Sequence, residues 1–124
     1  MNPFTKALTA RLNEQRLRAF VTRWDALEAL IIRVYRAKQA SPADVQEHAQ
    51  LRRWLVEHYG EWRAQLEPRW QRARCGKLPC TSDPFEFLLS ATTPEAFIGS
   101  WAHMQALPAA REALNSLILD LIEP

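Results

Sequence analysis

The sequence contains little glycine, and this shortage argues against a protein built from β-strands. Only 3 of the 124 residues are glycine, and there is no Asn-Gly or Asp-Gly pair of the kind that tight hairpins use. With 48% hydrophobic and 24% charged residues, the composition is still that of a globular chain and not of a disordered one. We therefore expect a folded protein in which strands have little part.

Long apolar runs are also missing. Arg or Glu interrupts every hydrophobic stretch before it reaches the roughly eighteen residues that a membrane-spanning helix needs. The first residues, Met1–Lys6, lack the basic segment, apolar block and small-residue cleavage site of a secretory signal. The sequence therefore predicts no membrane span and a cytoplasmic location.

The sequence also lacks the residue motifs by which metal-binding and nucleotide-binding sites are usually identified. Cys75 and Cys80 flank a predicted loop closely enough for a disulfide, although in a reducing compartment we expect thiols. The three histidines, His48, His58 and His103, show neither the Glu-x-x-His nor the His-x-x-x-His spacing of helical metal sites. Walker, Gly-x-Gly-x-x-Gly, Gly-x-Ser-x-Gly and Cys-x-x-Cys motifs do not occur. We therefore predict no metal and no cofactor.

Proline, in contrast, is abundant and marks where helices begin. It is favoured at the first helical position, where its missing N–H would have no partner, and a preceding Asn, Ser, Thr or Asp caps the next free donors. This pattern occurs at Asn2-Pro3, Ser41-Pro42, Asp83-Pro84 and Thr93-Pro94, and an uncapped Leu107-Pro108 follows. We predict a single all-α domain over residues 1–124, a helical bundle of two long helices, about 3–38 and 42–66, plus three shorter helices at 84–90, 94–104 and 108–122.

The first predicted helix carries a broad apolar face. At about 100° per residue, apolar side chains spaced alternately three and four apart form one stripe, made of Leu17, Phe20, Trp24, Leu27, Ile31, Val34 and Tyr35. Neighbouring apolar positions widen the stripe to well over half the circumference, so we expect this helix to lie centrally or in a dimer interface. Phe4 and Leu8 fall off the stripe, which indicates that the N-terminal turns bend, fray or pack on something different.

A histidine in the apolar face of the second predicted helix is the first candidate for chemistry. His48 falls between Leu51, Leu55 and Tyr59 on the helical wheel, and a buried neutral imidazole needs hydrogen-bond partners. One interpretation is a general base or ligand in a pocket shared by His48, Tyr59, Trp62 and His103. The other is a structural histidine that bonds to a core tyrosine or a carbonyl.

The segment 52–77 is basic and contains several tryptophans. Arginine pairs with phosphates and aromatic rings stack on bases, so nucleic-acid binding is one hypothesis, beside a solvated basic face or an acidic protein partner. Trp54 projects about 60° outside the main apolar face, and an exposed tryptophan beside an arginine is typical of interface anchors. The alternative is that Trp54 packs against the shorter C-terminal helices. The candidate interaction residues are Trp54, Arg52, Arg53, Arg69, Arg72 and Arg74.

Charge is divided unevenly along the chain. Residues 1–77 carry fifteen Lys and Arg against eight Asp and Glu, whereas residues 78–124 carry Arg111 against six acidic residues. We expect the acidic part to dock on the basic part, within one chain or between subunits.

The leading functional hypothesis is a non-enzymatic helical module for protein–protein interaction or oligomerisation, which self-associates as a homodimer or binds another protein. It depends on the apolar surface that the first helix has in excess. The alternatives are a small helical enzyme or ligand-binding protein with its pocket around His48, and nucleic-acid binding through residues 52–77.

Overall fold

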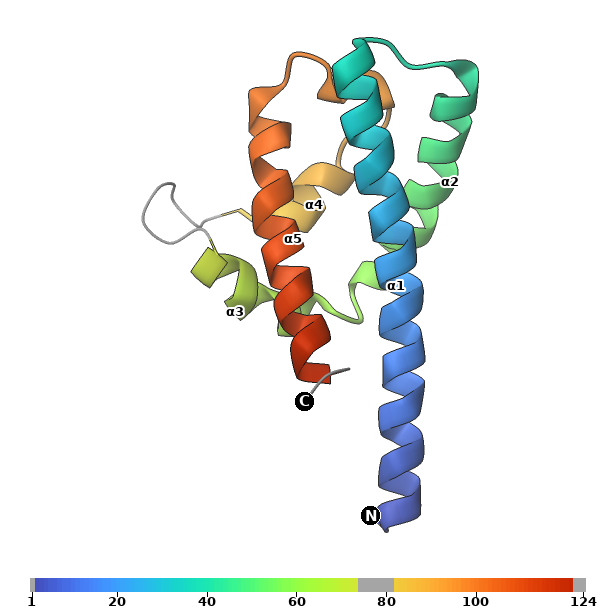
Figure 1. The fold of residues 1–124 in the computed structure, drawn as a ribbon, viewed down its shortest axis with the longest axis vertical. Coiled ribbons are helices and arrows are strands. Elements are labelled where there is room, and N and C mark those ends of the chain that lie inside the picture. The colour runs from blue at the N-terminus through green and yellow to red at the C-terminus, as the bar shows by residue number, and fades with distance from the viewer. Residues whose placement is uncertain (1, 74–81, 122–124) are drawn as a thin grey trace.

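The structure, a computed structural model, describes residues 2–73 and 82–121, and the regular elements found there are all helices (Figure 1). They are α1 (Pro3–Ala37), α2 (Pro42–Tyr59), α3 (Arg63–Ala73), α4 (Pro84–Leu89), a short 3₁₀ helix η1 (Pro94–Phe97) and α5 (Trp101–Leu121). The predicted all-α class is confirmed, with α1 and α5 as the two longest helices. In this part of the chain, no helix combines the length and hydropathy that a bilayer span requires.

Capped prolines begin the helices where the sequence predicted them. Asn2 Oδ1 accepts a hydrogen bond from the backbone of Thr5 at 2.8 Å and closes the first turn of α1. Ser41 and Asp44 form a reciprocal capping box at the start of α2, with distances of 3.0 and 3.1 Å. Asp83 accepts from the first backbone N–H groups of α4. These local signals fix the starts of three helices.

The second helix ends earlier than the predicted boundary near Leu66. α2 stops at Tyr59, and a tight turn follows in which the Trp62 N–H donates to the Tyr59 carbonyl at 2.9 Å. Pro68, a residue type that normally ends or kinks a helix, lies inside α3. The turn allows α3 to cross to α5 (Figure 1) and to bury Leu66 and Trp70. Tertiary packing therefore decides this boundary.

The C-terminal region contains one long helix where two shorter ones were predicted. The expected segment 94–104 is a 3₁₀ turn of four residues, and α5 begins at Trp101 and continues through Pro108. Pro108 lacks the N–H that would bond to the Met104 carbonyl, which normally weakens a helix. Burial of the residues on both sides, Leu107, Ala109 and Ala110, offsets that loss and keeps the helix continuous.

The hydrophobic core lies where α1 meets the other helices. The apolar stripe predicted for α1 is buried at Leu17, Phe20, Trp24, Leu27, Ile31 and Val34, whereas Tyr35, its last member, is only half-buried. Aromatic rings fill its centre, because Phe85 of α4 contacts Trp24 and Tyr59 with centroid distances of 4.9 and 5.2 Å. Burial of one such apolar side chain stabilises a fold by roughly 1.5–3 kcal/mol.

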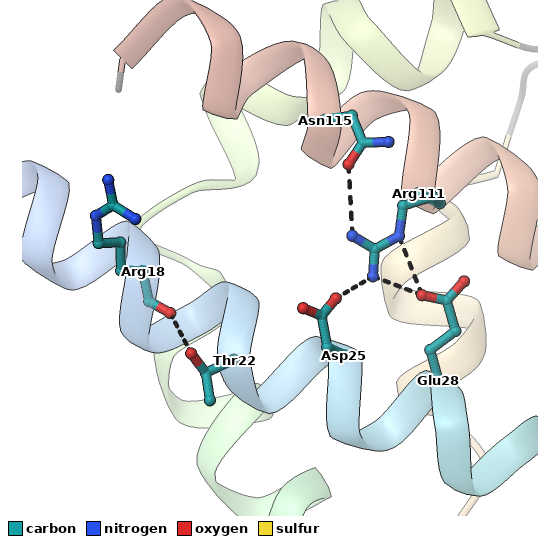
Figure 2. A network of polar contacts seen from close by, with 6 residues as sticks. All are labelled: Arg18, Thr22, Asp25, Glu28, Arg111 and Asn115. Atoms are coloured by element: carbon teal, nitrogen blue, oxygen red, sulfur yellow. Dashed lines mark hydrogen bonds and ion pairs between the residues drawn. The ribbon is translucent and has the colours of Figure 1, made fainter. Parts of the chain in front are cut away.

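Arg111 ties α5 to α1 (Figure 2). Its Nε and Nη2 donate to Glu28 Oε2 at 3.0 and 2.5 Å, Nη2 also pairs with Asp25, and Nη1 donates to Asn115 at 3.4 Å. Three further ion pairs join the basic region to the acidic one as the charge pattern predicted: Arg63–Glu86 at 2.8 Å, Arg63–Asp83 at 3.8 Å and Arg69–Asp120. Part of the uneven charge is therefore neutralised within one chain.

Candidate functional site

The N-terminal half of α1 projects beyond the rest of the protein (Figure 1). Leu17 is its first buried residue, and residues 3–16 have no buried side chain. At 1.5 Å per residue, this segment is about 21 Å long. The fraying considered for these turns is not observed, because the helix is continuous from Pro3 onward. We call residues 3–16 the projecting segment.

Three large apolar side chains lie along the projecting segment. Phe4, Leu8 and Leu12 are 78%, 47% and 45% exposed, and their spacing of four residues places them on one side of the helix. We call these three residues the exposed stripe. Isolated helices of fewer than about 12–15 residues are marginal in water, because most helices gain their stability from packing an apolar face. The projecting segment has such a face, and the described residues of this chain do not bury it.

A hollow opens between α1 and the end of α2, further along the same side of α1. It measures about 300 Å³, at the lower end of the range for ligand pockets, and is lined by Arg16, Ala19, Trp54, His58, Glu61 and Trp62. Ala19 lies seven residues, or two turns, after Leu12, so the two side chains share a face of the helix. The exposed stripe therefore leads into this cavity, which we call the Trp54 hollow.

Trp54 forms a fixed wall of this hollow. Its indole ring stacks on the imidazole of His58 with centroids 3.9 Å apart, and the Arg23 guanidinium carbon lies 4.0 Å from the indole centroid. The Phe20 ring lies next to the indole, with the two ring centroids 6.3 Å apart. His58 Nδ1 lies 2.8 Å from the Trp54 carbonyl, to which it donates, since a carbonyl can only accept. Trp54 is therefore half-buried, and its ring contacts among the described residues come from α1 and from His58 of its own helix.

The structure distributes the four predicted pocket residues over three places. His48 and His103 both set their rings edge-on against Phe97 of η1, with centroid distances of 5.9 and 5.2 Å. Trp62 lines the Trp54 hollow, whereas Tyr59 lines a different hollow between α2 and α4. The two histidines thus lie at a common ring, while Tyr59 and Trp62 face separate cavities.

His48 is fully enclosed, and its Nδ1 has no hydrogen-bond partner in the described part of the chain. Burial lowers the pKa of His48, the positive charge of Arg52 lowers it further, and Glu95 partly opposes both. Burial also lowers the pKa of His103, whose Nδ1 lies 2.5 Å from Ser100 Oγ. Ser100 Oγ accepts a hydrogen bond from the His103 backbone N–H at 3.5 Å, so Ser100 precedes α5 and caps its first turn, in which His103 lies.

Tyr59 connects the end of α2 to the start of α4. Its hydroxyl donates to Asp83 Oδ2 at 2.6 Å, and Asp83 Oδ1 accepts from the Phe85 backbone at 2.9 Å. Burial raises the pKa of Tyr59 far above its usual value, and the bond to Asp83 acts in the same direction. These contacts hold two helices together and give Tyr59 a structural role.

The basic interaction candidates differ in how far they are free to bind. Arg52 donates to the Leu89 carbonyl at 2.7 Å, and Arg69 pairs with Asp120. Arg53 and Arg72 are exposed, and Arg74 lies outside the described residues together with Cys75 and Cys80. Trp62 and Trp70 are buried, so their rings are not available to stack on bases. These contacts weigh against the nucleic-acid hypothesis.

Sequence reasoning found part of this surface and missed the rest. Phe4 and Leu8 were recognised as off the core stripe, but Leu12, which continues their spacing of four, was not used. Arg16, Ala19 and Glu61 could not be assigned, because the hollow depends on where α2 ends. In residues 2–73 and 82–121, no three His, Cys, Asp or Glu side chains cluster as a metal site would require.

Comparisons with protein-family models, with curated proteins and with solved structures give no match for this chain. Its function is therefore inferred from its own residues.

Proposed function

We propose that this chain is a non-enzymatic helical module that works by protein contact, and that it self-associates through the projecting segment of α1. The observation that carries the proposal is the exposed stripe of Phe4, Leu8 and Leu12 on a helix that extends past the body of the protein. The sequence indicated surplus apolar surface around the stripe between Leu17 and Tyr35. The exposed stripe lies outside that part of the helix and is a separate apolar surface.

Two physical arguments support this surface. A short unpacked helix is marginal in water, so the projecting segment gains stability when its apolar side is covered. Interface centres are enriched in aromatic side chains and arginine, which the Trp54 hollow supplies as Trp54 and Arg16. The stripe and the hollow together form one continuous surface along α1.

The proposal is tested by light scattering and sedimentation of the full chain over a range of micromolar concentrations. We expect the wild-type protein to be a dimer and the Leu8→Glu variant to be a monomer with an unchanged helical circular dichroism spectrum. Leu119→Glu is the matched control, because Leu119 on α5 is 54% exposed and also apolar. We expect this control to dimerise as the wild-type protein does. A strictly monomeric wild-type protein, or equal loss of association in both variants, would overturn the proposal.

A second candidate is a ligand-binding protein, and it depends on the unpartnered Nδ1 of buried His48. A small molecule that bonds to this nitrogen would raise the melting temperature of the wild-type protein and not that of His48→Leu. Equal shifts in both proteins, or none in a broad ligand screen, would remove this candidate. We propose the cytoplasm as the location for either function.

A further inference from the structure

We propose that the partner of the projecting segment is a second copy of this chain, with the two α1 helices antiparallel and crossing at Leu12. In this arrangement Phe4 of each protomer occupies the Trp54 hollow of the other. The inference rests on the proposed self-association and specifies how the two chains are arranged. The arrangement can therefore be wrong while self-association itself is right.

The positions of Phe4 and of the hollow along α1 support this crossing point. Phe4 precedes Leu12 by eight residues, or about 12 Å, and Ala19 follows Leu12 by seven residues, or about 10.5 Å. On the helical wheel, Phe4, Leu8, Leu12 and Ala19 lie within an arc of about 80°. A two-fold axis at Leu12 therefore brings Phe4 of one chain to the level of Ala19 in its partner. The surface is self-complementary, as a two-fold dimer requires.

The chemistry of the Trp54 hollow suits an aromatic side chain. Ala19 leaves space at its base, and the half-buried indole of Trp54 offers a ring surface for edge or offset contacts with a phenyl group. Arg23 and His58 already hold the Trp54 ring in place, so little side-chain freedom is lost on binding. The hollow is thus organised before a partner arrives.

The hollow contains charges of both signs. Arg16 and Glu61 line it, and Glu61 forms no ion pair with the described residues. The rest of the projecting segment carries Lys6 and Arg11 against Glu14, a net charge of +1. A basic residue of one chain can therefore pair with Glu61 of the other.

A competing register centres the two helices on Leu8, with Phe4 against Leu12 of the partner and both hollows empty. Disulfide trapping distinguishes the two registers. A disulfide requires a separation of about 4.4–6.8 Å between the two Cα atoms, and the same residue in the two chains comes this close only when it lies on the two-fold axis. In a Cys75→Ser, Cys80→Ser background, we expect Leu12→Cys to form a covalent dimer on oxidation and Leu8→Cys to form little. The reverse pattern would overturn the inference while leaving self-association intact.

A complementation experiment tests the seating of Phe4 directly. Phe4→Ala removes the aromatic side chain, and Ala19→Gln fills the hollow; we expect each to weaken its homodimer about tenfold or more, as loss of a central aromatic contact does. A mixture of the two variants retains one Phe4 and one open hollow that fit each other. The mixed dimer should therefore be tighter than either homodimer.

Thr22→Gln serves as the control for Ala19→Gln, because Thr22 is exposed on α1 three residues further along. We expect it to leave the dimer unchanged, and circular dichroism shows whether each variant remains helical. If the Ala19 variant does not fold, the Leu12 and Leu8 cysteine pair decides the register without it. A mixed dimer no tighter than the homodimers would overturn the seating of Phe4, and a monomeric wild-type protein would overturn the inference and the proposed function together.

Discussion

Arg111 and Glu28 join the two longest helices through two hydrogen bonds to one carboxylate oxygen. Both side chains are largely shielded from solvent, at 27% and 19% exposure, and Asp25 adds a second acceptor for the same guanidinium. Arg111 is the one Lys or Arg among residues 78–124, the acidic part of the chain. This single Arg lies at the contact between α5 and α1, where it pairs with acidic residues of the basic part.

Replacing Arg111 should destabilise the protein noticeably. Arg111→Ala leaves Glu28 partly buried without its partner, and we expect the free energy of unfolding to fall by about 2 kcal/mol. Arg18→Ala removes an exposed pair with Glu14 within α1 and should cost no more than about 0.5 kcal/mol. Urea denaturation at one fixed protein concentration measures both. Equal effects of the two substitutions would contradict a special role for Arg111.

Acid should destabilise the protein through His48. Because the pKa of His48 is lowered in the folded state by burial and by Arg52, the unfolded chain binds its proton more readily. The stability that the neutral ring contributes is fully present above the unfolded pKa of about 6.5 and is lost as the pH falls below it, at no more than about 1.4 kcal/mol per pH unit.

The matched variant is His48→Leu, compared with the wild-type protein by urea denaturation between pH 8 and pH 5. We expect the leucine variant to lose less stability over this interval, with the remaining loss including that from His103, whose pKa is also lowered by burial. Near pH 8 the variant should be at least as stable as the wild-type protein, because the substitution removes a buried nitrogen that has no hydrogen-bond partner among the described residues. Parallel pH dependences would show that His48 is not the group responsible.

Local signals in the sequence predicted most of the fold. Asn2, Ser41 and Asp83 begin helices where the Pro-containing caps indicated. The α1 stripe was read correctly because a periodicity of three and four residues reflects burial directly. In such places a few neighbouring residues contain all the information that determines the structure.

The boundaries that failed depend on contacts distant in sequence. Nothing near Gly60 requires a break, since its backbone has φ −55°, which any residue adopts, and Pro68 seemed the stronger helix terminator. α2 ends there because α3 packs on α5, some fifty residues away. The Trp54 hollow depends on the same turn. The candidate surface could therefore be predicted only in its N-terminal half, where the exposed stripe is local.

Tyr59→Phe should destabilise the protein by more than removal of an exposed hydroxyl would. The substitution removes the hydroxyl that donates to the Asp83 carboxylate, whose side chain is 7% exposed. Because hydrogen bonds to charged groups contribute about 1.5–3 kcal/mol, we expect a loss in that range. Tyr35→Phe is the control, since Tyr35 is only half-buried and Lys38 contacts the face of its ring. A similar small effect at both positions would rule out the Asp83 bond as a major contribution.

Alanine substitutions of Gly60, which follows α2, and of Gly99, which lies shortly before α5, should have different effects on the free energy of unfolding. Gly99 has φ +75°, a left-handed conformation that costs an L-residue about 1 kcal/mol, so Gly99→Ala should destabilise the fold. Gly60 has φ −55°, so Gly60→Ala should be neutral or should stabilise by about 0.4–1 kcal/mol through the unfolded state.

Steric crowding does not enter either prediction, because a Cβ atom added at Gly99 or at Gly60 meets no other atom within 4 Å. The backbone conformation is therefore the only difference that the pair tests. Chemical denaturation of the two alanine variants against the wild-type protein gives both changes in the free energy of unfolding. If Gly99→Ala proved as stable as Gly60→Ala, the left-handed conformation before α5 would not be a feature that this fold requires.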